Sequence, residues 1–232
     1  MLTPQGSVAA YGDIVGGLDP SARVLDCAAG TGQLAVGLRL KGFDVTATDA
    51  SAAMVQRTRQ LAAAHAVELP ATVCRWEELL DQGWSNSFDV VWCVGNSLIH
   101  ASGRRGRRQA LESMARVLAP RGMVVLTSRN WELIQAERWG LRLSPQLVER
   151  DQGTALVAYA WPIAFSWDEP HYLDIGVAVV NLGGDVTNHV SRLPFWPFRY
   201  NDLEADLRVA GLRVIASTYS DEVEEYLVAA TR

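Results

Sequence analysis

Cysteine is scarce in this chain of 232 residues, which contains Cys27, Cys74 and Cys93 and no other cysteine. An odd number of widely spaced cysteines favours neither a disulfide framework nor a four-cysteine metal site. Each of the three lies in or beside an apolar run, so we expect reduced, buried thiols. The sequence also shows no cluster of metal-ligating residues, and we expect no metal.

The sequence also lacks an excess of positive charge, and it lacks long apolar runs. The formal net charge is −5, which gives no general attraction to nucleic acids or anionic membranes. The first residues have neither the basic start nor the long apolar stretch of a signal peptide, and no later run approaches the length of a membrane span. We therefore expect a soluble, cytoplasmic protein whose partner is a small molecule.

One local basic run, GRRGRR at residues 103–108, departs from this charge balance. Aromatic residues are not interleaved with its arginines, and the run stands where a loop is expected to lead into a helix. We therefore predict a solvated helix face rather than a nucleic-acid site.

Apolar runs alternate with stretches of helical periodicity through the first ~135 residues, the pattern of repeated βα units and a parallel sheet. The predicted strands are residues 23–28, 44–49, 71–76, 89–94 and 123–128. The predicted helices are 33–42, a helix after the N-cap Ser51, and 106–120. With 49% hydrophobic residues, a chain of this length can bury the core of one domain.

The pattern changes between residues 141 and 200, where three apolar stretches follow one another without a helix between them. They predict an antiparallel flap inserted before a last helix at 200–212 and two closing strands at 213–220 and 224–232. We therefore expect an α/β fold with a doubly wound, mostly parallel sheet, forming a single domain over residues 1–232 that contains the flap.

The turn after the first predicted strand reads Gly30-Thr31-Gly32 and fits a dinucleotide fingerprint, which is weak evidence when it stands alone. Asp26 ends the preceding strand and would repel a pyrophosphate placed on this turn. A cofactor with a cationic end removes the conflict, and S-adenosylmethionine carries an ammonium and a sulfonium. Asp49, at the end of the second strand, could then accept both ribose hydroxyls. The alternative is that Asp26 only caps the turn and Asp49 only caps the next helix.

Three further segments narrow the choice, namely CRWEEL at 74–79, CVGNSLIH at 93–100 and TSRNWEL at 127–133. Together with the D-x-x-x-G-x-G turn they resemble the glycine N-methyltransferase group, which includes the glycine/sarcosine methyltransferases. The general likeness covers about residues 11–138. It implies a class I methyltransferase fold with a seven-stranded, Rossmann-like sheet and N-methylation at the expense of S-adenosylmethionine.

The resemblance also implies roles for individual residues. In the group, the arginine that corresponds to Arg129 binds the acceptor carboxylate, with help from the asparagine that corresponds to Asn96. The residues assigned to the acceptor are Asn96, Ser97, Arg129 and Trp131. The candidate catalytic residues are His100, as a base for the acceptor amine, and Tyr172. The residues assigned to the cofactor are Tyr11, Asp26, Ala28, Gly30, Gly32, Asp49, Ala50, Met54, Arg75, Trp76, Glu77 and Val94.

Structural roles remain open for several of these residues. Arg129 could pair with Glu132 or with the flap, Trp76 could belong to the core, and His100 could be structural. The aromatic residues of the flap could pack a lid core or line a pocket for a bulkier or methylated-ammonium substrate.

The leading hypothesis is methyl transfer to the amine of a small carboxylate-bearing acceptor. One alternative is a tailoring N- or O-methyltransferase of a secondary metabolite. Others are a protein that binds S-adenosylmethionine without turnover, and a nucleic-acid-modifying enzyme, which the absence of an N-P-P-Y-type motif argues against.

Overall fold

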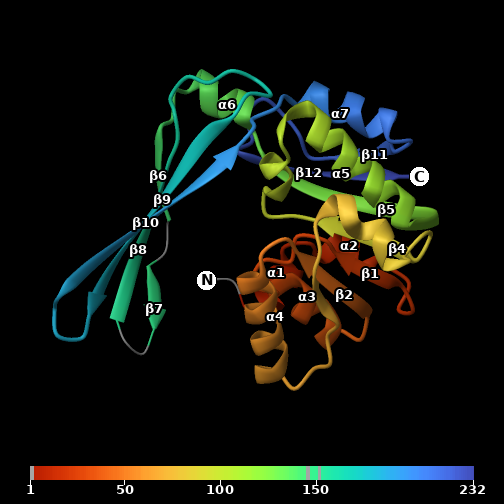
Figure 1. Ribbon diagram of the computed structural model, residues 1–232, viewed down its shortest axis with the longest axis horizontal. Helices are drawn as coiled ribbons and strands as arrows, with labels where there is room; N and C mark the ends of the chain where they lie inside the picture. The colour runs from red at the N-terminus through yellow and green to blue at the C-terminus, as the bar shows by residue number, and fades with distance from the viewer. Residues whose placement is uncertain (1–2, 145–146, 151–152) are drawn as a thin grey trace.

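The computed structural model describes residues 3–144, 147–150 and 153–232. Its larger sheet has seven strands in the order β11-β12-β5-β4-β1-β2-β3 (Figure 1). Their bounds are β1 Arg23–Asp26, β2 Asp44–Asp49, β3 Ala71–Val73, β4 Phe88–Cys93, β5 Leu118–Arg129, β11 Arg213–Ser217 and β12 Glu225–Thr231. Neighbours pair in parallel from β3 to β5, and β12 is antiparallel to both β5 and β11. The predicted doubly wound, mostly parallel fold is confirmed.

The order of the strands reverses beside β1, because β2 and β4 lie on its two sides. Ligands of open α/β sheets bind at the carboxyl ends of the strands at such a point. This edge carries Asp26 at the end of β1, Asp49 at the end of β2 and Arg129 at the end of β5.

Helices cover both faces of the sheet. They are α1 Pro4–Ala9, α2 Gly12–Gly16, α3 Gln33–Leu40, α4 Ala52–Ala64, α5 Gly103–Val117, α6 Trp131–Ala136 and α7 Tyr200–Val209, with 3-10 turns η1 Trp76–Gln82 and η2 Ser97–His100. None of the helices in the described ranges has both the length and the apolar character needed to cross a membrane.

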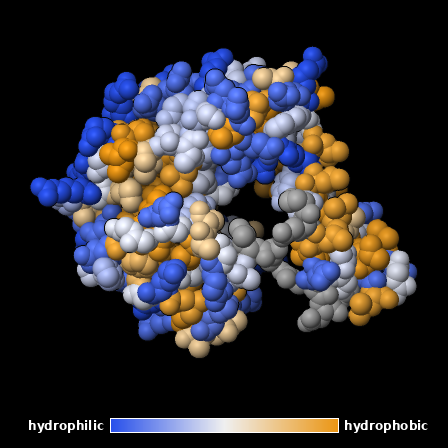
Figure 2. Space-filling view, turned by 180° about the vertical axis from the view of Figure 1, so that it is seen from behind, coloured by the Kyte–Doolittle hydropathy of each residue, from blue (hydrophilic) through white to orange (hydrophobic). Residues whose placement is uncertain are grey.

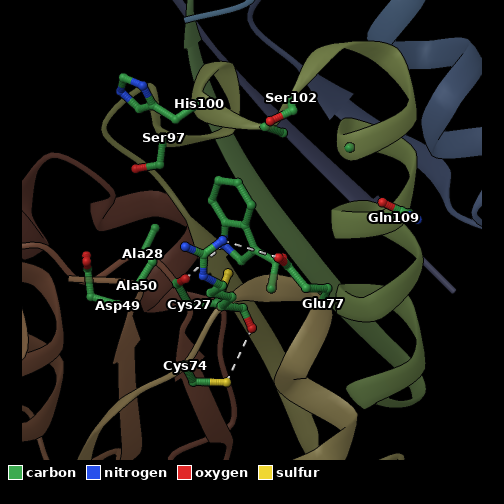
Figure 3. A pocket seen from close by; sticks show the side chains of 14 residues that line it. Cys27, Ala28, Asp49, Ala50, Cys74, Glu77, Ser97, His100, Ser102 and Gln109 are labelled. Atoms are coloured by element: carbon green, nitrogen blue, oxygen red, sulfur yellow. Dashed lines mark hydrogen bonds and ion pairs between the residues drawn. The ribbon is translucent and has the colours of Figure 1, made fainter. Parts of the chain in front are cut away.

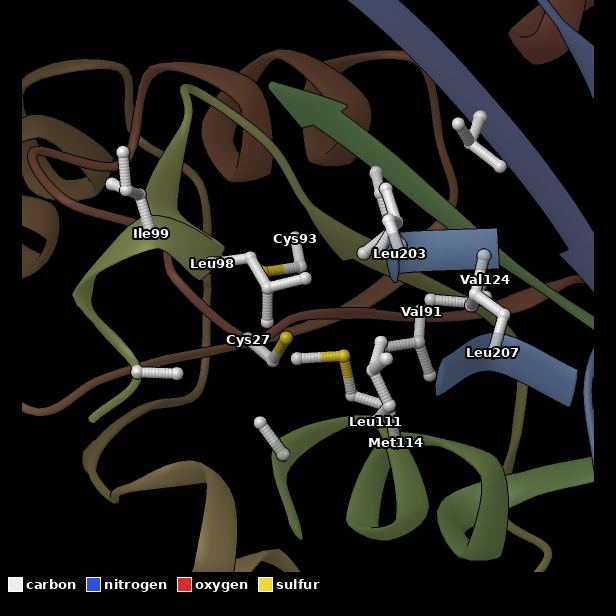
Figure 4. Close-up of a cluster of buried hydrophobic side chains, with 14 of the residues drawn as sticks. Cys27, Val91, Cys93, Leu98, Ile99, Leu111, Met114, Val124, Leu203 and Leu207 are labelled. Atoms are coloured by element: carbon white, nitrogen blue, oxygen red, sulfur yellow. The ribbon is translucent and has the colours of Figure 1, made fainter. Parts of the chain in front are cut away.

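Alternation along β4 divides the core between the two faces, since successive strand residues point to opposite sides. Val91 packs in the cluster that contains Leu111 of α5 and Leu207 of α7 (Figure 4). Its neighbours Val90 and Trp92 belong instead to the cluster formed with α1, α3 and α4. Cys27, Cys74 and Cys93 are buried free thiols, as expected.

Between α6 and α7, five antiparallel strands form the second sheet, which we call the flap. They are β6 Leu141–Leu143, β7 Val148–Arg150, β8 Gly153–Ala160, β9 His171–Asn181 and β10 Val186–Phe195. The order is β10-β9-β8-β6, with β7 on β8. Figure 1 shows the long strands projecting away from the body, and Figure 2 shows hydrophobic residues over their surface. The three long predicted strands are confirmed, whereas β6 and β7 were too short to predict.

Several predicted boundaries were wrong. The strand expected to reach residue 76 ends at Val73, because the backbone N–H of Arg75 donates to Glu78 and begins η1. Helix α5 begins at Gly103 rather than at residue 106. The division of the whole chain into one domain stays a prediction.

The prediction of a solvated face for residues 103–108 fits the exposed Arg105 but was wrong for Arg107. Positions 104, 107 and 108 share one side of α5, which faces α7. Arg107 is 1% exposed and donates to Asp206 of α7 through two guanidinium nitrogens, at 2.9 and 2.7 Å. Its Nη1 donates to Asp168, between β8 and β9, at 2.6 Å, and Arg104 and Arg108 also donate to Asp206.

We expect Asp206→Ala to lower the free energy of unfolding by about 3–5 kcal/mol, because it leaves the buried Arg107 charge without its main partner. Urea denaturation measures the change. Asp202→Ala is the matched control, since Asp202 lies 3.9 Å from Arg104 in a weaker, partly exposed pair, and it should cost less than about 1 kcal/mol. Equal losses for the two variants would contradict the structural role of Asp206.

Candidate active site

The turn after β1 needs both of its glycines. Gly32 has a φ of +83°, and a Cβ at this position would lie 2.8 Å from Cγ2 of Thr58. Gly30 has a φ of +55°, and a Cβ there would point into open space. The turn is fastened from the other side, where the Thr58 hydroxyl donates to the Gly30 carbonyl at 3.0 Å. A ligand can therefore approach the backbone of Gly30 closely.

Asp49 holds this turn against the second strand. One carboxylate oxygen accepts from the N–H of Gly30 at 2.9 Å and the other accepts from the N–H of Ser51 at 2.8 Å. The cap of α4 is the Ser51 hydroxyl, which accepts from the N–H of Met54. Each oxygen of Asp49 keeps a second lone pair that a ribose hydroxyl could use.

Asp26 is 1% exposed, and its Oδ1 is buried without a hydrogen-bond partner among the described residues. Burial raises the pKa of this carboxyl to about 7, and the negative charge of Asp49 adds to the increase, whereas the backbone amides of Ala28 and Ala35 oppose it. A buried acid with a free oxygen fits a cationic ligand group, because a nearby positive charge would favour the ionised form.

A cleft of about 440 Å³ opens beside Asp49 (Figure 3). The predicted cofactor residues that line it are Ala28, Asp49, Ala50, Arg75, Trp76 and Glu77. The indole N–H of Trp76 donates to the Cys27 carbonyl at 2.9 Å, which fixes the ring as one wall. Figure 3 shows Asp49 on one side of the cleft, with Ser97 and His100 at its upper end. We call it the cofactor cleft, after its predicted ligand.

The other predicted cofactor residues, Asp26, Gly30 and Gly32 among them, do not line this cleft. Tyr11 packs on Trp92 with ring centroids 5.2 Å apart. Burial raises the pKa of Tyr11, a hydrogen bond to Thr127 lowers it, and the Asp26 carboxylate contributes to the increase. The Val94 carbonyl accepts from the Ser97 hydroxyl at 2.7 Å. Met54 is 37% exposed at the start of α4, and its side chain does not line the cleft.

A second cavity, of about 270 Å³, adjoins the first at His100, which lines both. We call it the acceptor pocket, because Asn96, Arg129 and Trp131 line it. Ser97, which was also assigned to the acceptor, lines the cofactor cleft instead. Asn96 has a φ of +61°, and its Oδ1 accepts from the N–H of Arg129 at 3.0 Å. The loop after β4 is thus tied to the end of β5.

The Arg129 guanidinium faces both an acid and the flap. Its Nη2 lies 3.8 Å from Glu225 of β12. Its carbon lies 5.8 Å from the centroid of Tyr159 and 5.6 Å from that of Trp161. Glu132 does not pair with Arg129, since it accepts from Tyr200 N–H and Tyr219 O–H. The long, exposed ion pair with Glu225 is weak, so the guanidinium can exchange this partner for a ligand carboxylate.

His100 lies at the boundary between the two cavities. Its Nδ1 is 2.8 Å from the Pro194 carbonyl of β10. A carbonyl only accepts, so Nδ1 carries the proton in this hydrogen bond and Nε2 of the neutral ring has a free lone pair. The contact also joins the turn η2 to the flap.

The catalytic assignment of Tyr172 disagrees with the structure. Leu173 and Ile175 of β9 line the acceptor pocket, and alternation turns Tyr172 to the opposite face of the flap. There Tyr172 is 54% exposed and lies under the Arg192 guanidinium, in a different cavity. The position of Tyr172 in the sequence does not predict which face of β9 points toward the acceptor pocket.

Trp131, by contrast, lines the acceptor pocket from within the core. It is 2% exposed and packs against the rings of Trp161, Phe165 and Phe195. Its indole N–H is buried without a partner among the described residues.

Sequence reasoning missed several lining residues of the acceptor pocket, namely Tyr159, Leu173, Ile175, Leu193 and Glu225. The alternation of apolar and polar residues along the flap strands predicts a sheet with two different faces. It does not predict which of these faces packs toward the body. Glu225 reaches Arg129 because the two residues are direct partners in the register of β12 on β5.

Residues 24–122 match the family model described as a methyltransferase domain. The match contains the glycine turn, Asp26, Asp49 and the Asn96 loop. This segment is therefore similar to methyltransferase domains. The chain is also 30% identical over 151 residues to the glycine/sarcosine N-methyltransferase of Aphanothece halophytica, covering 60% of this chain and 56% of that protein. The resemblance to the glycine N-methyltransferase group is therefore confirmed, although the chain spans only about half the length of the curated relatives it matches.

Solved structures extend the likeness of the fold over nearly the whole chain. An S-adenosylmethionine-dependent methyltransferase from Clostridium acetobutylicum has a TM-score of 0.76 at 14% identity, covering 98% of this chain and 90% of that one. An amino pentose methyltransferase from Micromonospora echinaspora, solved with S-adenosylmethionine bound, has a TM-score of 0.74 at 20% identity, covering 99% and 92%. At these identities the likeness shows a class I methyltransferase fold. The domain match supports the expected enzyme class and the expected cofactor, S-adenosylmethionine.

We expect Asp49→Ala to weaken binding of S-adenosylhomocysteine by about 1–3 kcal/mol, because the ribose and the turn both lose a charged acceptor. Calorimetry measures the affinity. Asp44→Ala is the matched control, because Asp44 begins the same strand and its side chain is 72% exposed. Unchanged affinity for Asp49→Ala would place this residue outside the site.

The raised pKa of Asp26, about 7 without ligand, predicts a pH dependence of cofactor binding. Below this pH the carboxyl holds a proton that a cationic ligand must displace. Affinity should therefore rise about tenfold per pH unit up to about pH 7 and then level off. At pH 7, binding should release about half a proton, measured by calorimetry in buffers of different ionisation enthalpy.

Asp26→Asn is the control for this pH dependence, since an amide does not titrate in this range. The interpretation fails if wild-type affinity is the same at pH 5.5 and 7.5 and no proton is released.

Proposed function

We propose that this protein transfers a methyl group from S-adenosylmethionine to the amine of a small acceptor whose carboxylate binds Arg129. One observation carries the proposal. The cleft beside Asp49 and the pocket beside Arg129 meet at His100, which lines both. A cationic cofactor and the carboxylate of the acceptor could therefore bind at neighbouring sites that carry groups of opposite charge.

Asp49, which lines the cleft, and two residues outside its lining, Gly30 and Asp26, fit the cofactor. Gly30 has open space beside its backbone, Asp49 presents acceptor oxygens, and the buried Asp26 has an oxygen without a partner. When bound, S-adenosylmethionine supplies an activated methyl group on a sulfonium sulfur. Asp26 and Asp49 would orient its cationic and ribose parts.

On the acceptor side, the planar guanidinium of Arg129 can bind a carboxylate through two parallel hydrogen bonds. Asn96 fixes the backbone from which this side chain projects. A nucleophilic amine must be neutral, and the free lone pair on Nε2 of His100 can accept its proton. Positioning of the two reactants should supply most of the rate.

A second candidate is a tailoring N- or O-methyltransferase that acts on a secondary metabolite without a carboxylate. Glu225 favours it, because its negative charge lies 3.8 Å from Arg129 and offsets the charge that would attract an anion. The likeness over 99% of the chain to an amino pentose methyltransferase is consistent with this reading.

We expect Arg129→Ala to lower kcat/KM for a carboxylate-bearing acceptor by about 30- to 200-fold, with Arg129→Lys in between. The loss of a buried, hydrogen-bonded charge partner costs about 2–5 kcal/mol of transition-state binding. Because Arg129 is partly exposed, we expect a cost near the lower end of this range. Both variants should keep their affinity for S-adenosylhomocysteine. Arg142→Ala is the control, because Arg142 lies on the flap but outside the acceptor pocket.

Esterifying the acceptor carboxylate distinguishes the two candidates. If Arg129 binds this carboxylate, kcat/KM of the wild type should be much lower for the ester than for the free acid. Arg129→Ala should lower kcat/KM for the ester only slightly further, since esterification and the substitution remove the same interaction. Penalties that simply add would show that the carboxylate binds elsewhere, and the tailoring reading would then be preferred.

A further inference from the structure

The far wall of the acceptor pocket is a continuous apolar surface on one face of the flap. Leu173 and Ile175 point to this face from β9. In the register of the sheet, Leu193 of β10 is the direct partner of Leu173, and Tyr159 of β8 is the direct partner of Ile175. Direct partners on one face are in contact range. We call Tyr159, Leu173, Ile175 and Leu193 the flap wall.

The side chains of the flap wall are not fully buried by other residues of the protein. Leu193 is 39% exposed, and the other three residues are partly exposed. Apolar side chains that surround a cavity lose this exposure when an apolar ligand group packs on them, which favours binding.

The charged groups of the pocket come from the body, although the Arg129 guanidinium also reaches the flap, 5.8 Å from the centroid of Tyr159. Arg129 and Glu225 come from the paired strands β5 and β12, and Asn96 comes from the loop after β4. A ligand in the pocket therefore meets Arg129 and Glu225 from the body and the aliphatic side chains of Leu173, Ile175 and Leu193 from the flap. The volume of this pocket is about 270 Å³.

We infer that the acceptor carries an apolar or aromatic side chain, larger than that of glycine, which packs on the flap wall. Leu173, Ile175 and Leu193 are then the residues that determine acceptor specificity. The inference rests on the proposed methyl transfer to an amine. A sugar acceptor fits this wall poorly, because its hydroxyl groups would be buried against aliphatic carbon without partners.

Steady-state methyl transfer by the full chain at saturating S-adenosylmethionine tests the inference. The acceptors are glycine, leucine and phenylalanine, together with 3-methylbutylamine and phenethylamine, which lack the carboxylate. Burial of a leucine-sized side chain should raise kcat/KM for leucine and phenylalanine about 10- to 100-fold above that for glycine.

Two variants tie this preference to the flap wall. Leu193→Ser should reduce the preference for the larger acceptors over glycine about tenfold, and Ile175→Ala should reduce it about threefold to tenfold. Leu182→Ser is the matched control, because Leu182 is 85% exposed beyond the end of β9 and lies outside the pocket. It should leave every rate unchanged, and thermal unfolding checks that all three variants are folded.

The outcomes separate this inference from the proposed function. Glycine turned over as well as leucine and phenylalanine, or equal effects of Leu193→Ser and Leu182→Ser, would overturn the inference and leave the proposed function standing. Amines without a carboxylate that react as well as the amino acids, with the same loss in Leu193→Ser, would support the flap wall and refute the carboxylate role of Arg129. No methylation of any amine in the panel, despite binding of S-adenosylhomocysteine, would overturn both.

Discussion

The buried guanidinium of Arg107 is the point at which three parts of this chain are held together. It joins α5 to Asp206 of α7 and to Asp168 beside the flap, and its other face lies on the ring of Phe198, 4.6 Å from the centroid. A buried ion pair adds little net stability over a well-packed apolar pair, but any arrangement that separates its members leaves a buried charge unpaired. Helix α5 begins directly after the turn that carries His100, and so this constraint also limits how the flap can sit against the site.

The two cavities differ in charge in a way that suits a reaction between a cation and a zwitterion. Asp49 supplies negative charge at the end of β2, Asp26 adds to it when its buried carboxyl is ionised, and Arg129 supplies positive charge at the end of β5, partly offset by Glu225. His100 lies between them and adds no fixed charge when it is neutral. Each proposed reactant would thus find its counter-charge on its own side, while the amine remains in the least charged region.

Much of the fold could be predicted from the sequence, and the reasons are local. The strands that became β1, β2 and β4 are apolar runs that end in turn residues, and Ser51 is a strong N-cap for α4. Helices α1, α2 and α6 are too short to give a clear periodic signal. The GRRGRR run was misread because its acidic partner, Asp206, is about a hundred positions away along the chain. The same limit applies to Glu225 and Tyr172, since register and strand face are set by tertiary packing.

The walls of the acceptor pocket come from two different sheets. One wall consists of the ends of β4, β5 and β12, and the other consists of side chains on β8, β9 and β10. The cofactor cleft has no residue of the flap in its lining as described. Substitutions in the flap can therefore alter one ligand site while leaving the other untouched. Such a division allows a lineage to change its acceptor through a few flap residues without having to rebuild the site for its methyl donor.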